Sequence, residues 1–260
     1  MSELKYIPFE DESEEIKTKV TDYWTERADS FLLQRQHELD SPKAQMWQKE
    51  ICAWLPDPKT AGRPISVLDV GCGAGFFTIL FGKEGFHVTG IDLTSEMIVK
   101  AEELIRLNGP YQGSVKVMEM DAESLSFEDE TFDAIVTRNL TWTLPDLEKA
   151  YRSWYKLLAK GGTLVNFDAD YCHEFSDAED VALLPNHAHK TIPPDLLAEG
   201  DEITLEMCAY QNRRPEWDLR LLIDAGFSRV TVDVGVWKRV YAEPDEFYNP
   251  TPIFTIAAEK

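Results

Sequence analysis

The stretch Val67–Phe77, VLDVGCGAGFF, decides the fold of this 260-residue chain. It continues a short apolar run, Ile65–Val70, of the kind that forms a buried parallel strand. Gly71, Gly73 and Gly75 come next, and a helical pattern follows at once. Glycines at such a turn let the backbone bend sharply and let a ligand approach where a Cβ would obstruct it. A strand, a glycine turn and a helix in this order predict a ligand site at the carboxyl end of a parallel strand.

Strand and helix patterns alternate through most of the rest of the chain. The expected strands are Ile65–Val70, Phe86–Asp92, Ser114–Met120, Phe132–Thr137, Thr163–Asp168, Arg229–Val236 and Phe254–Ala258, and the expected helices between them are 74–83, 95–107, 145–158 and 215–226. Alternation of this kind implies right-handed crossovers. It predicts an α/β fold whose mostly parallel sheet has helices on both faces.

Three further segments flank or interrupt this core. Residues 1–55 are expected to form an N-terminal helical arm, which the linker PDPKTAGRP separates from the core at 65–171. Residues 172–214 break the alternation with several prolines, histidines and acids, and are expected to be an inserted cap over one end of the sheet. Residues 215–260 complete the core.

The composition limits the classes of partner. The net charge of −21 opposes binding to nucleic acid or to anionic membranes, because both depend on Lys and Arg contacts. No stretch is long and apolar enough to span a bilayer, and the polar, acidic N-terminus is unlike a secretory signal. The four scattered cysteines include no CxxC pair, so reduced thiols and a cytoplasmic location are expected.

Two acids follow the next two strands. Asp92 ends the second strand, 21 residues after Gly71, where a carboxylate can accept from both hydroxyls of a ribose. Asp121 follows the third strand, where it can accept from an amine such as that of adenine. The glycine spacing is GxGxG, with Phe76 in the place of the third glycine of the dinucleotide fingerprint GxGxxG. The pattern therefore favours a nucleoside ligand other than a dinucleotide.

The motifs VLDVGCGAGFF, GIDLTSEMI and MDAESLSF…FDAIVTRN together resemble the class I S-adenosylmethionine-dependent methyltransferases. The likeness covers roughly 67–170, and is greatest to the small-molecule branch related to the ubiquinone and menaquinone biosynthesis methyltransferases. It implies a Rossmann-like sheet of seven strands, the last one antiparallel. It also implies S-adenosylmethionine as the cofactor.

The resemblance assigns roles to individual positions. Those implied to contact the cofactor are Asp69, Gly71, Gly73 and Gly75 at the methionine part, Asp92 at the ribose, Leu93 and Met97 beside sugar and adenine, Asp121 and Ala122 at the adenine, Arg138 and Asn139 near the transferred methyl, and Tyr23 and Trp24 on the arm. Cys72, in the same loop, is counted among these cofactor-binding positions, and its side chain is expected to pack against the cofactor.

Residues that could bind or deprotonate the methyl acceptor follow the fourth and fifth strands. Asp168, Asp170 and His173 are candidate bases or substrate ligands. Trp142 and Tyr171 are candidate substrate contacts, and Trp142 has the alternative of plugging the junction of helix and sheet. No metal is expected, because the spacings of Cys172, His173, His187, His189 and Cys208 fit no standard zinc pattern.

The sequence thus predicts in-line methyl transfer to a small molecule, in which the protein chiefly aligns the reactants. A nicotinamide oxidoreductase, a non-catalytic protein that binds the cofactor, and a protein methyltransferase are the alternatives. An RNA substrate is disfavoured by the charge and by the fourth strand ending in RNLTWTLP instead of an NPPY-type motif. The acceptor atom, and the choice between monomer and homodimer, stay open.

Overall fold

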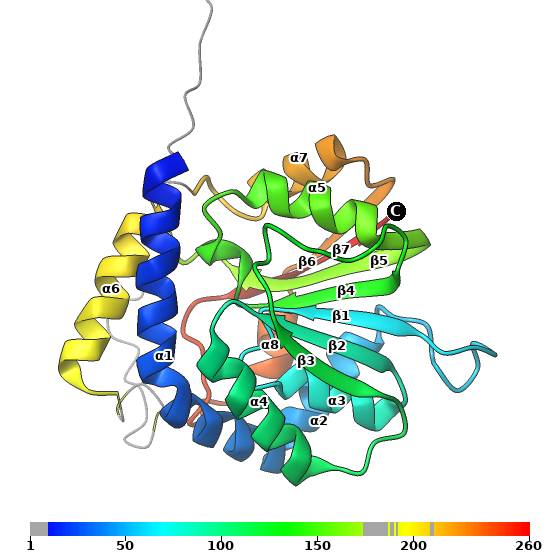
Figure 1. Ribbon diagram of the computed structural model, residues 1–260, viewed down its shortest axis with the longest axis horizontal. Coiled ribbons are helices and arrows are strands. Elements are labelled where there is room, and N and C mark those ends of the chain that lie inside the picture. The colour runs from blue at the N-terminus through cyan, green and yellow to red at the C-terminus, as the bar shows by residue number, and fades with distance from the viewer. Residues whose placement is uncertain (1–9, 174–186, 188–189, 191, 209–210) are drawn as a thin grey trace, which may run out of the picture.

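The computed structural model describes residues 10–173, 187, 190, 192–208 and 211–260. Its centre is a seven-stranded sheet of order β3-β2-β1-β4-β5-β7-β6 (Figure 1). The strands are β1 Ser66–Val70, β2 His87–Asp92, β3 Val115–Glu119, β4 Phe132–Arg138, β5 Leu158–Ala169, β6 Arg229–Asp233 and β7 Ile253–Glu259. β1 to β5 pair in parallel, and β7 runs antiparallel to both β5 and β6. The expected seven-stranded α/β sheet with an antiparallel last strand is confirmed.

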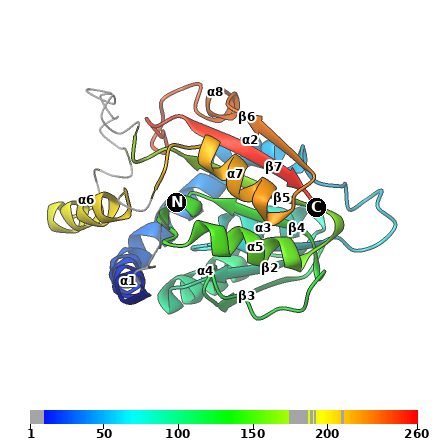
Figure 2. The same ribbon diagram turned by 90° about the horizontal axis from the view of Figure 1, so that it is seen from above.

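Helices cover both faces of this sheet (Figures 1 and 2). One face carries α2 Pro42–Cys52, α3 Phe76–Glu84, α4 Ser95–Asn108 and the short α8 Val236–Val240, and the other carries α5 Leu147–Leu157 and α7 Glu216–Ala225. Successive residues of a strand point to opposite faces, so Val67 packs in the first core and Leu68 in the second. Burial on both faces explains why β1 reads as a continuous apolar run.

The N-terminal helical pattern forms two helices. α1 runs from Glu10 to Asp40, and α2 begins after Ser41, whose hydroxyl accepts from the Lys43 amide as an N-cap ahead of Pro42. α1 lies across the edge of the sheet where the parallel strands end (Figure 1). Its Phe31 ring reaches Gly73 in the loop after β1.

Within the predicted cap, the structure describes Cys172 and His173, residues 187, 190 and 192–208, and 211–214. α6 Pro194–Cys208 packs beside α1 through a cluster in which Ile203 and Met207 contact Ile16. His189 lies outside the described residues.

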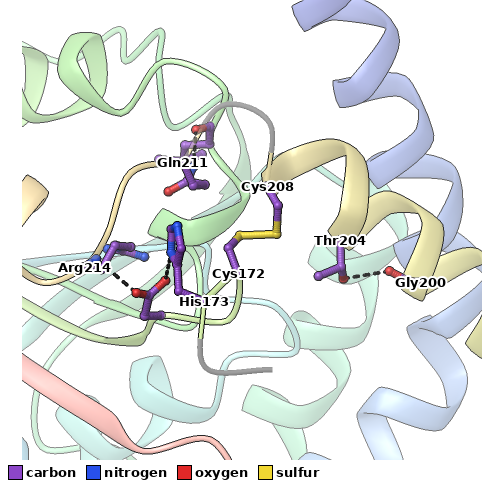
Figure 3. The surroundings of a disulfide bond; sticks show 9 residues. Cys172, His173, Gly200, Thr204, Cys208, Gln211 and Arg214 are labelled. Carbon is purple, nitrogen blue, oxygen red and sulfur yellow. Dashed lines mark hydrogen bonds and ion pairs between the residues drawn. A yellow bond between two sulfur atoms is a disulfide. The ribbon is translucent and has the colours of Figure 1, made fainter. Parts of the chain in front are cut away.

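A disulfide joins Cys172 to Cys208, while Cys52 and Cys72 are free (Figure 3). The expectation of four reduced thiols is therefore wrong for this pair. Thirty-six residues separate the two cysteines, and only the return of α6 to the end of β5 brings them together. The cysteines therefore give no support to the expected cytoplasmic location.

Two elements end at other residues than the sequence predicted. The helix predicted for 145–158 ends at Leu157, because β5 already begins at Leu158 and runs through the glycines expected to close the helix. The predicted strand 229–236 ends at Asp233, and α8 follows it. In the described part of the chain, no helix has the length and apolar character that crossing a membrane requires.

We predict that Trp47→Ala lowers the free energy of unfolding by about 3–5 kcal/mol, as truncation of a large core aromatic does. Trp47 is fully buried, and its ring packs edge-on against Phe77, Phe167 and Tyr241. It therefore holds α2 against the sheet. Urea unfolding measures the loss.

The neighbouring Met46 is 41% exposed and supplies the control. Met46→Ala should change the free energy by no more than about 0.5 kcal/mol. An equal effect of the two substitutions would contradict the role given to Trp47.

Candidate functional site

The loop after β1 has the backbone that its glycines predicted. Gly71, Gly73 and Gly75 have φ of 68°, 51° and 86°, which is the left-handed region where other residues are strained. The Gly73 amide donates to the Asp92 carboxylate at 2.9 Å, and the Thr94 amide donates to its other oxygen at 3.0 Å. The ends of β1 and β2 are thereby joined. A carboxylate has about four acceptor sites, so Asp92 can still accept from hydroxyls of a ligand.

Two side chains cover this loop. A Cβ at Gly73 would lie 2.9 Å from the Phe31 ring of α1, and a Cβ at Gly71 would lie 2.8 Å from Leu140. Both neighbours are ends of side chains, which can rotate more easily than backbone can shift. The glycines therefore permit a close approach that Phe31 and Leu140 make here.

Asp69 lies beneath the loop in β1. It is fully buried, and its carboxylate accepts from the Thr78 hydroxyl at 2.6 Å. Burial raises the pKa of Asp69 to about 7, against the weaker opposing effect of the Thr78 hydrogen bonds.

We predict that Asp69→Asn stabilises the protein at about pH 8 by up to roughly 4 kcal/mol. Each unit of difference between the native and the unfolded pKa of Asp69 corresponds to about 1.4 kcal/mol. The native carboxyl holds its proton to higher pH than the unfolded one. Asp69 therefore costs stability as the pH rises through the window between the two pKa values. The gain should disappear near pH 3.5, and urea unfolding across this pH range measures it.

Asp133→Asn is the contrasting control. Arg63 holds the pKa of Asp133 below its ordinary value, so this carboxylate stabilises the native state above its unfolded pKa. Its replacement should lower stability at about pH 8. A pH-independent effect of Asp69→Asn would contradict the titration given to Asp69.

Asp121, the predicted adenine acceptor, is in an ion pair. The Lys17 ammonium of α1 lies 2.8 Å from Asp121 and 2.6 Å from the buried Glu123. The Glu123 amide donates to the other Asp121 oxygen at 2.8 Å. Lys17 thus ties the start of α1 to the segment after β3, an interaction that no pattern in the sequence indicates.

The other positions predicted to contact the cofactor lie in or near this edge of the sheet. Met97, Ala122 and Cys72 are buried, and Leu93 is partly buried. Trp24 contacts Phe31 with ring centroids 5.1 Å apart, so it lies close to the glycine loop. The Tyr23 ring lies against Gly200 of α6. The two aromatic residues therefore point to different neighbours.

Arg138 and Asn139 end β4 in different surroundings. Arg138 pairs with the buried Glu38 of α1 at 2.8 Å and stacks 4.3 Å above the Trp47 ring. Asn139 has a φ of +54°, uncommon for a residue other than glycine, and accepts from the Tyr171 hydroxyl at 3.1 Å. Arg138 thus anchors the arm, and Asn139 faces the residues after β5.

The carboxyl end of β5 holds a buried polar cluster. Asp168 pairs with the Arg214 guanidinium at 3.1 Å and accepts from the Trp142 amide at 3.0 Å and from the Thr141 hydroxyl. Arg214 also donates to the buried Asp218 of α7 through two nitrogens. This network commits Asp168 to holding β5, η1 (Thr141–Thr143) and α7 together.

Asp170 and His173 form a pair beside this cluster. The His173 Nδ1 lies 2.7 Å from Oδ1 of Asp170, and the other oxygen of Asp170 accepts from the Arg214 amide. Asp170 is buried, whereas the His173 side chain is 38% exposed. Figure 3 shows His173 next to the disulfide and close to Arg214. Of the three predicted candidates for a base, His173 is the accessible one.

The two predicted substrate contacts lie together. The rings of Trp142 and Tyr171 have centroids 5.0 Å apart, and the Asn249 amide donates to the Tyr171 hydroxyl at 2.9 Å. Burial raises the pKa of this hydroxyl well above its usual range. Trp142 therefore follows β4 and Tyr171 follows β5 at neighbouring strand ends.

Arg214 has a larger role than its sequence suggested. The only sequence signal was an Arg pair at 213–214, and its partner Asp168 lies 46 residues away, at a contact that no spacing reveals. Among the residues that the structure describes, no group of three or more His, Cys, Asp or Glu is arranged to hold a metal ion.

The sheet order, the glycine loop and Asp92 at the end of β2 together define the class of S-adenosylmethionine-dependent methyltransferases. A family model described as a methyltransferase domain matches residues 68–166. Residues 68–166 are a methyltransferase domain of the class I S-adenosylmethionine-dependent type.

Individual relatives agree with this assignment. A malonyl-[acyl-carrier protein] O-methyltransferase of Erwinia billingiae is 32% identical over 52% of each chain. A ubiquinone/menaquinone biosynthesis C-methyltransferase UbiE of Bradyrhizobium diazoefficiens is 29% identical over 70% of this chain and 73% of its own. The chain spans about half the length of several of the curated relatives it matches.

A solved structure supports the fold. Phosphoethanolamine N-methyltransferase 2 of Haemonchus contortus, in complex with S-adenosyl-L-methionine, matches with a TM-score of 0.56 over 87% of this chain and 60% of its own. Its sequence identity is 16%, so the likeness concerns the fold alone.

Proposed function

We propose that this protein transfers the methyl group of S-adenosylmethionine to a small molecule bound beneath α1 and α6. The observation that carries the proposal is the convergence of two groups of residues at one edge of the sheet: the glycine loop tied to Asp92, and the polar ends of β4 and β5. The similar proteins named above are an O-, a C- and an N-methyltransferase. These likenesses therefore leave the acceptor atom open.

The residues at the first three strand ends fit the cofactor. The left-handed glycines offer a turn without a Cβ, and Asp92 offers acceptor sites for the ribose. When bound, the cofactor supplies a methyl group already activated on a sulfonium. The protein's own work is then to align the acceptor with that methyl and to exclude water.

Binding requires three rearrangements in this proposal. Phe31 must rotate away from Gly73, and Leu140 from Gly71, because both side chains occupy the face that the glycines leave open. Lys17 must share or release Asp121 if that carboxylate is to accept from the adenine amine. Two of these residues, Phe31 and Lys17, lie on α1. A small movement of this helix would open the site at both places.

We predict that Asp92→Ala weakens binding of S-adenosylhomocysteine at least about tenfold, since hydrogen bonds to a charged group are lost. Calorimetry measures the affinity, and circular dichroism checks the fold. The exposed Asp129 gives the control variant Asp129→Ala, which should bind normally.

Binding of NAD in place of S-adenosylhomocysteine by the wild-type protein would contradict the proposed function. Normal binding by a folded Asp92→Ala variant would contradict only the ribose assignment.

For acceptors that must lose a proton, we propose His173 as the general base and Asp170 as the residue that positions it. A carboxylate bonded to Nδ1 holds that nitrogen as the donor and leaves Nε2 to take a proton. Asp168 is less suited to this role, since Arg214 and Thr141 already engage it. A hydroxyl or a protonated amine needs such a base, whereas a thiolate does not.

We predict that His173→Asn lowers kcat by about 10²–10⁴, the usual contribution of a general base, with unchanged affinity for S-adenosylhomocysteine. The assay follows S-adenosylhomocysteine release with a panel of hydroxyl- and amine-bearing small molecules.

The exposed His87 supplies the control His87→Asn, which should keep full activity. An unaltered kcat of His173→Asn with these acceptors would remove His173 from this role.

A further inference from the structure

Arg27 of α1 is a buried cation without a partner among the residues that the structure describes. It is 4% exposed, and its Nε and Nη1 atoms are buried with no hydrogen-bond acceptor in the part of the chain that the structure describes. No ion pair is formed by Arg27 among these residues either, in a protein of net charge −21. The chain thus has an excess of acids, yet none of those described pairs with this guanidinium.

Other cations in the same part of the molecule are paired. The carboxylate partners are Asp121 and Glu123 for Lys17, Glu38 for Arg35 and Arg138, Asp245 for Lys43, and Asp168 and Asp218 for Arg214. The rule in this fold is that a buried cation has a carboxylate. Arg27 departs from it.

An unpaired buried guanidinium is costly, because arginine keeps its charge in proteins and loses its hydration on burial. Burial lowers the pKa of Arg27 from its ordinary value. Buried polar atoms without partners are rare and call for an explanation. A bound anion supplies one, since the planar fork of arginine matches a carboxylate or a phosphate with two parallel hydrogen bonds.

The position of Arg27 on α1 directs it to the proposed site. Tyr23, one turn earlier, has its ring against Gly200 of α6, and Phe31, one turn later, has its ring against Gly73 of the glycine loop. Residues four apart share one face of a helix. Arg27 therefore lies between the contact of α1 with α6 and its contact with the glycine loop.

We infer that Arg27 is a recognition residue for a carboxylate or phosphate group of a small molecule held beneath α1. The inference rests on the proposed function for the location of that molecule. Two sources have the required chemistry: an anionic acceptor, and the carboxylate in the methionine part of the cofactor. Arg27 would then bind a negatively charged group in a protein that is otherwise strongly acidic.

The test compares Arg27→Gln with the wild type and with Arg220→Gln, an exposed position on α7 that undergoes the same change of charge. Calorimetry measures binding of S-adenosylhomocysteine and of 5′-methylthioadenosine, which lacks the amino-acid carboxylate. Malonate and inorganic phosphate are then titrated into the free protein and into the protein saturated with 5′-methylthioadenosine.

If the cofactor is the source, Arg27→Gln loses at least about tenfold in affinity for S-adenosylhomocysteine and keeps its affinity for 5′-methylthioadenosine. If the acceptor is the source, both nucleosides bind normally and the wild-type affinity for malonate or phosphate is lost. The inference is overturned if Arg27→Gln alters none of these affinities by more than about twofold. Wild-type protein that binds neither nucleoside contradicts the proposed function instead, and the titrations of free protein still test Arg27.

Thermal unfolding separates recognition from a structural role. Replacing an unpaired buried charge with an apolar side chain of similar length should shift Tm of the free Arg27→Met variant upward. Arg214→Met is the matched control, and its Tm should fall, because Asp168 and Asp218 would lose their partner. A fall in Tm for Arg27→Met, with anion binding retained, would assign Arg27 to the fold alone.

Discussion

One buried carboxylate fixes the position of α1, and the site depends on that position. Glu38 is fully buried, lies near the end of α1, and pairs with Arg138 of β4 at 2.8 Å and with Arg35 of its own helix. Burial alone would raise the pKa of Glu38, but the two guanidinium groups hold it below its usual range. Removing one partner of such a pair leaves an uncompensated buried charge, so the network holds the arm to the sheet.

With its C-terminal end fixed in this way, α1 reaches along the edge of the sheet. Phe31 lies on Gly73, and Lys17 lies between Asp121 and Glu123. The same helix therefore covers the loop after β1 and the segment after β3. Access to the proposed cofactor site depends on contacts of single side chains on α1, whereas the buried pair at Glu38 is the part of the arm least able to move.

The far side of the site is organised by Arg214. Its guanidinium connects Asp168 of β5 to Asp218 of α7, and its backbone amide holds one oxygen of Asp170. The other oxygen of Asp170 is then available to His173. The adjacent disulfide ties the same segment to α6, which itself packs on α1. The two sides of the site are thus linked through the cap.

Much of the fold could be predicted from the sequence because its signals are local. A strand buried on both faces is a continuous apolar run, a left-handed turn needs glycine, and a helix has its own spacing, so β1, the glycine loop and most helices are recognisable within ten residues. Short α8 was missed because strand and helix patterns cannot be separated over so few residues.

Local pattern by itself determined the α/β class, the glycine turn and the carboxylate at the end of β2, since each depends on residues close together in the chain. Only the tertiary structure decided that Lys17 would form an ion pair with Asp121, that Cys172 would form a disulfide with Cys208, and that Asp168 would pair with Arg214. Each of these contacts joins residues between 36 and 104 positions apart. Such pairs are chosen by packing of whole elements, and no spacing in the sequence records them.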